Sequence, residues 1–310
     1  MRPCRQRQRG LTVAELMIAM ALGLAVLLAC GKLLIGVTQA YAMQVEAEAM
    51  DEAGRYALDA VARAVRQSAH VDRAALPTPD PTLPARIAGL DARSVPRNGQ
   101  GIDAALPDAV NGSDVLALRF PGSGPPPKGD GGTVDCAGFP VHAGEEGWSI
   151  FYVGRNAQGE AELRCKYHGN SNWSADAVAG KVDGFQVLYG LDGDGDGVPE
   201  RYVNASTLAV LDAGLMLNGA NPMQRAQDLI RRTHWKRVAA VRVALLLHGP
   251  RLDSGAGKDA GYALFGPGHA SAQAGGDPGT LLAERTLAGR EGARMRKVYS
   301  ATVALPAMPE

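Results

Sequence analysis

The feature that most constrains this chain is a long apolar run close to its N-terminus. Residues 16–37 read LMIAMALGLAVLLACGKLLIGV, and Lys32 is the only charged residue among them. As an α-helix this run would extend roughly 33 Å, enough to cross the roughly 30 Å hydrocarbon core of a bilayer. Residues 1–10 contain four basic residues and no acidic residue: the basic residues are Arg2, Arg5, Arg7 and Arg9. Positively charged flanks stay in the cytoplasm, so the sequence predicts that the chain after residue 37 is exported.

Three kinds of N-terminal segment begin with basic residues and an apolar run. A cleaved secretory signal has both, but it has no use for an acid such as Glu15 near the start of the run, because a carboxylate is costly in lipid. A lipoprotein signal would use residues 27–30 (LLAC) as its lipobox and would acylate Cys30. The apolar run continues past Cys30, however, where lipoproteins usually turn polar. The third kind, a prepilin, gives Glu15 a purpose.

Residues 9–16, RGLTVAEL, resemble the cleavage motif of type IV pilins and of type II secretion pseudopilins. In that family a dedicated peptidase cuts after the glycine and methylates the new N-terminus. The resemblance implies a basic leader over residues 1–10 that ends at Gly10, and a methylated first residue at Leu11. It also implies that Glu15 is the family's assembly glutamate. The N-terminal amine of a neighbouring subunit can pair with the charge of this carboxylate. Leu11 is a departure, since phenylalanine is commoner there.

The helix is predicted to continue beyond the membrane. Residues 39–69 contain no proline and one glycine, Gly54. Two acid–base pairs at i,i+4 spacing support a helix: Asp51 with Arg55, and Asp59 with Arg63. Three apolar residues form a stripe along this helix: Leu58, Val61 and Val65. The resemblance implies one long helix over residues 11–70, with the membrane anchor at about 16–37.

The rest of the chain reads as a β-rich body. Prolines end the helix, and residues 71–113 are expected to form an irregular, proline-rich connection to an exported head domain over residues 114–310. Predicted strands there are 114–120, 148–153, 161–167, 185–189, 238–247 and 297–305, with a short helix at 223–232 and long loops at 121–132 and 249–279. The predicted fold class is α+β: a pilin fold with a long N-terminal helix packed on a mainly antiparallel β head.

Four further segments resemble PilW-type minor pilins: DEAGRYAL at 51–58, GFQVLYG at 184–190, VAAVRVAL at 238–245 and RKVYSATVAL at 296–305. The resemblance implies a minor pilin that helps to initiate the type IV pilus at its tip and supports twitching motility, adhesion or DNA uptake. Its partners would be other minor pilins, the major pilin, the prepilin peptidase and the inner-membrane assembly machinery. It would lie in the bacterial inner membrane with its head in the periplasm, and later in the fibre. The alternatives are a J-type pseudopilin of type II secretion and a Ca²⁺-binding lipoprotein adhesin acylated at Cys30.

No motif in the sequence predicts an enzyme. None of the six histidines forms HExxH and no GxSxG elbow is present. Residues 255–259, GAGKD, lack the first glycine and the final hydroxyl residue of a phosphate loop. Lysine plus arginine equals aspartate plus glutamate, 32 against 32, so charge gives no argument for a nucleic-acid partner.

An acidic run, DGDGDGVPE at residues 192–200, predicts a Ca²⁺ site because alternate carboxylates in a tight turn can converge on one hard cation. The expected ligands are the side chains of Asp192, Asp194 and Asp196, the carbonyl of Val198, and Glu200 directly or through water. The run departs from an EF-hand, since its twelfth position is Val203. The alternative is a solvated acidic hairpin turn.

Two cysteines, Cys136 and Cys165, belong to the exported part, whereas Cys4 would leave with the leader and Cys30 lies in the anchor. The periplasm is oxidising, so the sequence predicts a Cys136–Cys165 disulfide. The alternative is a pair of reduced, buried thiols.

Overall fold

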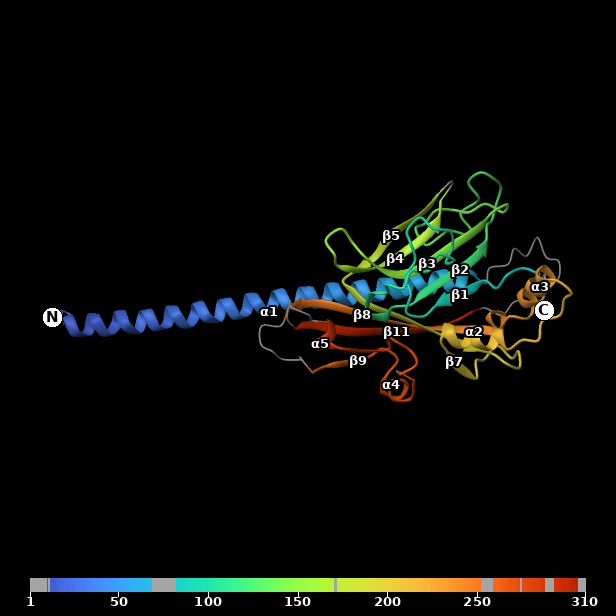
Figure 1. The fold of residues 1–310 in the computed structure, drawn as a ribbon. Helices are drawn as coiled ribbons and strands as arrows, with labels where there is room; N and C mark the ends of the chain where they lie inside the picture. Colours follow the sequence, from blue (N-terminus) through green and yellow to red (C-terminus); the bar gives the residue numbers. More distant parts are fainter. Residues whose placement is uncertain are drawn as a thin grey trace. The chain divides into compact units, whose positions relative to one another are not determined.

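The computed structural model of the chain describes residues 10, 12–68, 82–169, 172–251, 259–273, 275–287 and 293–305. The chain divides into two compact units, Met1–Ala49 and Met50–Glu310. Helix α1 (Val13–Ser68) provides nearly all of the described part of the first unit and the first element of the second (Figure 1). The predicted long N-terminal helix is therefore confirmed.

In the first unit, every residue from 13 to 46 is exposed. An 18-residue window of α1 has a mean hydropathy of 2.4, and the helix is long and apolar enough to cross a membrane. A single chain in water would expose these leucines, isoleucines and methionines to solvent. This surface therefore needs lipid or other chains to cover it.

In the second unit, α1 buries one face in the main hydrophobic core. Its buried residues there are Met50, Gly54, Ala57, Val61, Ala62, Ala64, Val65 and Ser68, and Leu58 packs against them. The predicted apolar stripe is thus confirmed. The same core includes Phe151 and Leu163 from one sheet and Phe185 and Val243 from another, so α1 joins two β layers into one folded unit.

The first layer is a five-stranded antiparallel sheet in the order β1-β2-β3-β4-β5. Its strands are β1 (Ile87–Leu90), β2 (Val115–Pro121), β3 (Glu146–Arg155), β4 (Ala161–His168) and β5 (Trp173–Gly180). Alternate residues of β3 face opposite ways: Phe151 and Val153 enter the main core, whereas Ile150 and Tyr152 pack in a smaller cluster. Period-two alternation of this kind is what the pleat of a strand requires.

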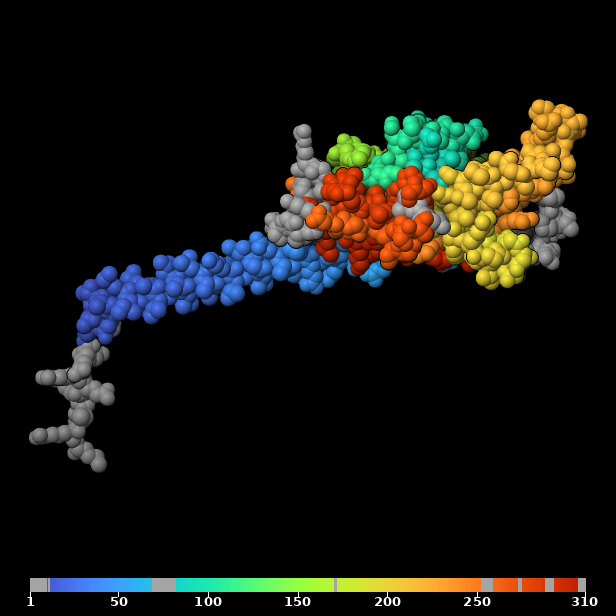
Figure 2. Space-filling model, turned by 60° about the horizontal axis from the view of Figure 1, so that its bottom comes forward, coloured from blue at the N-terminus to red at the C-terminus, as the bar shows by residue number. Residues whose placement is uncertain are grey.

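The second layer is a four-stranded antiparallel sheet in the order β11-β8-β6-β7. Its strands are β6 (Val182–Leu191), β7 (Arg201–Val203), β8 (Val238–Arg251) and β11 (Arg294–Ala304), and β9 (Gly261–Ala263) pairs with β10 (Leu281–Ala283) beside it. All ten residues of β6 are buried, as expected for an inner strand of this sheet. The segments from β7 onward, coloured yellow to red, cover much of the face in Figure 2.

Short helices complete the second unit: α2 (Ala205–Ala213), α3 (Pro222–Arg232), α4 (Pro267–Gln273) and α5 (Glu284–Leu287), with 3₁₀ turns η2 (Val110–Gly112) and η3 (His234–Arg237). The predicted helix at 223–232 is confirmed as α3. Asn221 caps it by accepting a hydrogen bond from the N–H of Gln224 at 2.9 Å. The α+β fold class is confirmed.

Two segments expected to be irregular contain regular structure. The connection predicted over 71–113 includes β1, and the loop predicted over 249–279 includes the end of β8, all of β9 and α4. β1 has four residues, too few for a periodic pattern, and its pairing with β2 holds it in place. Gly89 of β1 also passes directly over Tyr189, whose hydroxyl would be 1.8 Å from a Cβ at that position.

Candidate functional site

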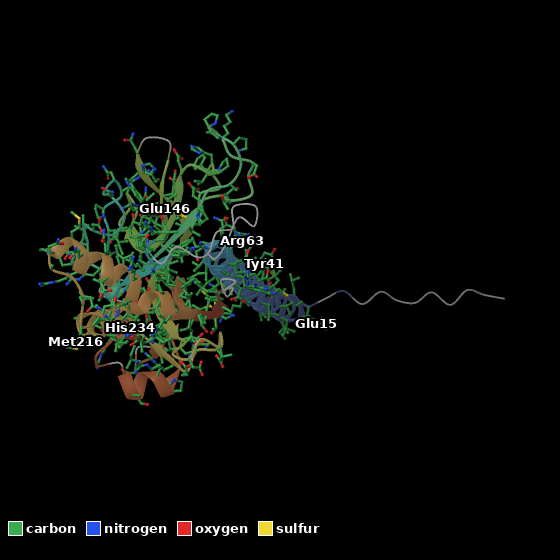
Figure 3. All side chains as sticks on the ribbon, turned by 90° about the vertical axis from the view of Figure 1, so that its right-hand side faces the viewer. Glu15, Tyr41, Arg63, Glu146, Met216 and His234 are labelled. Carbon is green, nitrogen blue, oxygen red and sulfur yellow. A yellow bond between two sulfur atoms is a disulfide. The ribbon has the colours of Figure 1, made fainter. Side chains whose placement is uncertain are left out.

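The start of α1 is a capping box formed by Thr12 and Glu15 (Glu15 is labelled in Figure 3). The N–H of Thr12 donates to Glu15 Oε2 at 2.9 Å, the Thr12 hydroxyl donates to the same oxygen at 3.0 Å, and the N–H of Glu15 donates to Thr12 Oγ1 at 3.3 Å. This reciprocal pattern satisfies N–H groups that a helix start otherwise leaves open. The T-x-x-E spacing is visible in the sequence and could have identified Thr12. Glu15 remains exposed, so its carboxylate can still reach a group on another chain.

The predicted cleavage point lies just before this box. Gly10 is exposed, and among the described residues nothing lies within 4 Å of the position that a Cβ would occupy. Packing against the described residues therefore does not require a glycine there, and its role in cleavage stays a prediction. Leu11, the predicted methylated residue, lies outside the described residues.

Two of the residues that tie α1 to the head are Asp51 and Gly54. The predicted pairing of Asp51 with Arg55 is present only as the smallest of the charge interactions on Asp51. The Asp51 carboxylate instead accepts from Lys297 Nζ at 2.7 and 3.0 Å and from the Tyr299 hydroxyl of β11, while Arg55 donates to the backbone oxygen of Asp51. The bonds from Lys297 and then Tyr299 hold the pKa of Asp51 below its usual value. The other predicted pair is present, with Arg63 2.8 Å from Asp59.

Gly54 is required by the same junction. The Tyr299 ring lies so close to the helix that a Cβ at Gly54 would be 2.8 Å from three ring atoms. A side chain at position 54 would therefore push β11 away from α1. Two segments that resemble PilW-type pilins, residues 51–58 and 296–305, meet at this contact.

The predicted Cys136–Cys165 disulfide is present, with a Cα–Cα distance of 6.0 Å. It ties the loop before β3 to β4. The same loop is held to α1 by Gln67, whose Nε2 donates to the carbonyl of Val134 at 2.6 Å and whose Oε1 accepts from the Val134 N–H at 3.2 Å. Helix, loop and sheet are thus joined by one covalent bond and two hydrogen bonds. The described free cysteine, Cys30, is exposed on α1.

The acidic run forms a tight turn between β6 and β7. Its carboxylates accept backbone N–H groups of the turn: Gly195 and Gly197 donate to the two oxygens of Asp192 at 2.6 and 2.8 Å, and Gly193 donates to Glu200 at 2.8 Å. Gly195 and Gly197 both have φ of 85°, a conformation that favours glycine. The turn therefore follows from the sequence spacing alone.

Three of the predicted ligands come together in this turn. One oxygen from each of Asp192, Asp194 and Glu200 lies within 4.8 Å of the others. Asp196 is outside this group and accepts from the N–H of Val198 at 2.7 Å. The N–H of Asp196 lowers the pKa of Asp194, but the neighbouring carboxylates, that of Asp196 first, outweigh it and raise that pKa. A cation would relieve this repulsion.

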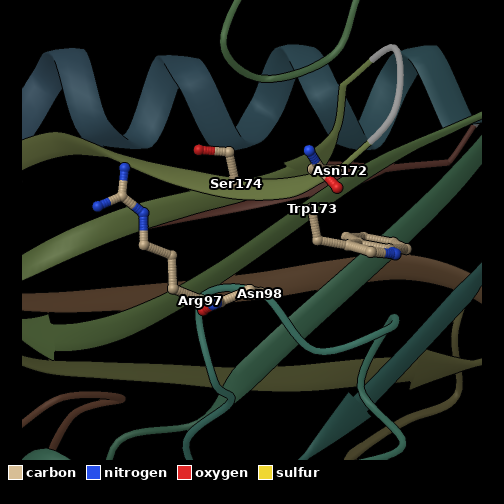
Figure 4. A pocket seen from close by; sticks show the side chains of 5 residues that line it. All are labelled: Arg97, Asn98, Asn172, Trp173 and Ser174. Atoms are coloured by element: carbon tan, nitrogen blue, oxygen red, sulfur yellow. The ribbon is translucent and has the colours of Figure 1, made fainter.

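A shallow polar cavity of about 520 Å³ lies beside β5 (Figure 4). Its lining residues are Arg97, Asn98, Asn172, Trp173 and Ser174. Arg97 lies 3.8 Å from Asp176, and the Trp173 ring packs edge-on to Trp148 with centroids 5.7 Å apart. These contacts account for the two largest side chains of the cavity, which the sequence did not single out.

Comparison with known protein families gives two matches. A family model described as type IV pilus-assembly protein W matches residues 150–307, about half of the chain. A model of the prokaryotic N-terminal methylation motif matches residues 5–31, which include the cleavage point, the capping box and most of the apolar run. No curated protein and no solved structure matches the chain.

Proposed function

Since the chain belongs to the family of type IV pilus-assembly protein W and carries an N-terminal methylation motif, we propose that this membrane-anchored pilin is a minor pilin that helps to initiate type IV pilus assembly at the fibre tip. Its role is structural, in keeping with the family, and without catalysis. Twitching motility, adhesion or DNA uptake would depend on it indirectly.

The proposal rests on one contrast in the molecule: Glu15 is open to contact with other subunits, whereas the head is large. Glu15 is exposed in a helix whose residues 13–46 are all exposed, so both the carboxylate and the apolar surface are open to other subunits. A carboxylate in an apolar setting is stabilised by a paired cation, which the N-terminal amine of a neighbouring pilin supplies. The second unit, Met50–Glu310, is large for a subunit repeated around a narrow helical core. A subunit at the end of a fibre faces fewer neighbours and tolerates such a head.

The partners follow from the same reasoning. The prepilin peptidase would cut after Gly10 and methylate Leu11, and the inner-membrane assembly machinery would receive the mature chain. The other minor pilins and the major pilin would pack along residues 13–46, which are exposed in the single chain. The second unit would lie in the periplasm before assembly and at the cell surface afterwards.

Deletion of the gene, followed by complementation, tests the proposal. The deletion strain should lose most surface pili while the major pilin remains in the membrane. Full-length protein should restore the pili, Glu15→Ala should be cleaved but should not restore them, and the matched control Glu52→Ala, an exposed glutamate on the same helix beyond residue 46, should restore them. Normal surface pili together with impaired type II secretion in the deletion strain would contradict the proposal and favour a J-type pseudopilin.

We also propose that the acidic turn binds Ca²⁺, because Asp192, Asp194 and Glu200 converge there. A ligand that binds only the folded chain stabilises it by mass action, so the Tm of the full chain in detergent should rise at about 1 mM Ca²⁺, a concentration that extracellular sites respond to. Asp194→Asn should abolish the rise, and Asp196→Asn should reduce it less. Equal rises in wild type and Asp194→Asn would contradict the proposed site.

A further inference from the structure

A second cavity, of about 460 Å³, lies within the second unit between α1, the disulfide loop and the sheet of β3, β4 and β5. It exists because the residues around it are small, among them Ala60 and Ala64 of α1, Gly138 of the loop and Ala177 of β5. Tyr56, 55% exposed, also lines it, as does Arg63, which Figure 3 labels. The cavity is therefore reachable from solvent along α1.

Two buried polar atoms in its lining have no hydrogen-bond partner among the described residues: Asp135 Oδ2 and Ser149 Oγ. Asp135 is 4% exposed and Ser149 is fully buried. The other carboxylate oxygen, Asp135 Oδ1, is already used, since it accepts from the N–H groups of Ala137 and Phe139 at 2.9 and 3.0 Å. Buried polar atoms are nearly always paired and are costly when they are not, so two unpaired atoms in one cavity call for an explanation.

The charges around the cavity favour a cation. Burial raises the pKa of Asp135, as expected for a carboxylate without a counter-ion. Asp176, which also lines the cavity, accepts from the Tyr167 hydroxyl at 2.7 Å and lies 3.8 Å from Arg97, so its charge is already partnered and Asp135 is the carboxylate left to attract a cation. Arg63 is the cation of the lining, and its guanidinium is 2.8 Å from Asp59, so its charge is offset.

Apart from Gln67, whose amide is bonded to Val134, much of the remaining lining is apolar, and this favours one kind of cation over another. The disulfide, the alanines and Val178 can accommodate an aliphatic stem. A guanidinium binds best when both oxygens of a carboxylate are free to receive its planar fork, and Asp135 offers one. An ammonium is a compact donor group that can bond to a single carboxylate oxygen and to a hydroxyl.

We propose that this cavity binds a primary alkylammonium group, with Asp135 as its counter-ion, Ser149 as a second acceptor and the aliphatic stem against the disulfide and the alanines. The group can come from a free amine or from a lysine side chain of another chain. This binding site does not depend on the proposed role in pilus assembly.

Calorimetric titration of the full chain in detergent tests this proposal. The probe is n-pentylammonium, and 1-pentanol and n-pentylguanidinium serve as neutral and planar comparisons. Pentylammonium should bind saturably and at least about 10-fold more tightly than either, as a charge-assisted hydrogen bond implies. Nα-acetyl-lysine amide distinguishes the sources: binding comparable to that of pentylammonium favours a lysine side chain, and weaker binding favours a free amine.

Substitutions inside and outside the cavity test whether pentylammonium binds there. Asp135→Asn keeps the oxygen that caps the loop but removes the charge, and it should weaken pentylammonium binding about 10-fold or more; Ser149→Ala should weaken it by a smaller factor. The matched control is Asp130→Asn, because Asp130 also accepts a backbone N–H in a neighbouring turn, that of Gly132 at 2.9 Å, but does not line the cavity. No saturable binding, equal binding of 1-pentanol, or equal losses for Asp135→Asn and Asp130→Asn would overturn the proposal.

Discussion

The two parts of α1 differ in what they contact, although one helix runs through both. From residue 13 to 46 every side chain is exposed, whereas between Met50 and Ser68 eight residues are buried in the second unit. At Gly36 in the first part, a Cβ would meet nothing within 4 Å among the described residues, whereas at Gly54 in the second part it would meet an aromatic ring at 2.8 Å. Helical structure alone therefore does not reveal what a residue is for.

The two parts of α1 are therefore constrained by different contacts. The first part keeps a helical, apolar surface for lipid and for other subunits, so substitutions there should affect anchoring and assembly. The second part is fixed by the chain's own sheets, so substitutions there should affect the stability of the second unit. Matched pairs of substitutions, one from each part or unit, test whether only the second part contributes to the stability of the second unit.

The largest effect is expected from the cysteines. The double variant Cys136→Ser, Cys165→Ser opens a loop with a sequence separation of 29, which should lower the free energy of unfolding by about 3–4 kcal/mol in the chain-entropy model. Urea unfolding of the full chain in detergent, followed by tryptophan fluorescence, measures the loss. Cys30→Ser in the first unit is the control and should leave the curve unchanged. A comparable loss in Cys30→Ser would break the division between the two units.

A smaller effect is expected from the glycines. Gly54→Leu forces a side chain against the Tyr299 ring and should lower the free energy of unfolding by about 2 kcal/mol, a typical cost of overpacking. Gly36→Leu, which meets no neighbour among the described residues, should not lower it. The same unfolding assay measures both variants. If Gly54→Leu unfolds like wild type, the contact between α1 and β11 does not restrain the helix.

The smallest effect is expected from the carboxylates. The pKa of Asp51 is lowered in the folded chain, so the stability that it contributes is present above its unfolded pKa of about 3.9 and is lost as pH falls through the lower folded value. Asp51→Asn should therefore lower the Tm at pH 7 and remove part of the loss seen as the pH falls below about 4. Glu15→Gln, in the first unit, should leave the Tm unchanged at pH 7. An acid transition that is identical in wild type and Asp51→Asn would contradict the assignment.

Sequence reasoning was most successful where a pattern is local. The helix, six strands and α3 were placed to within a few residues, and the disulfide was identified from compartment and cysteine count. It was least successful where partners are distant in sequence. Asp51 bonds to Lys297, 246 residues away, and nothing near Asp51 in the sequence reveals that Lys297 rather than Arg55 donates the hydrogen bonds to its carboxylate. β5, WSADAVAG, has too few large apolar residues to show a strand pattern, and its pairing with β4 holds it in the sheet.

The acidic turn and the cavity beside the disulfide differ in the same way in how far the sequence predicts them. The acidic turn follows from residues within a stretch of nine, so the convergence of Asp192, Asp194 and Glu200 could be predicted. The cavity beside the disulfide could not, because it is made by small side chains from three separate segments and by the unpaired atoms of Asp135 and Ser149. Small residues leave no pattern in a sequence that distinguishes an empty space from a close contact.

The bond between Asp51 and β11 has a mechanical consequence. In the proposed fibre, tension would pull on the subunit through its anchor, and this force would enter the second unit at residue 50. Within one residue it meets Asp51, which is bonded to Lys297 and Tyr299, and β11 is in turn hydrogen-bonded to β8 from Arg294 to Ala304. We expect the load to be shared between the buried face of α1 and a ladder of backbone hydrogen bonds, so that no single contact has to resist it alone.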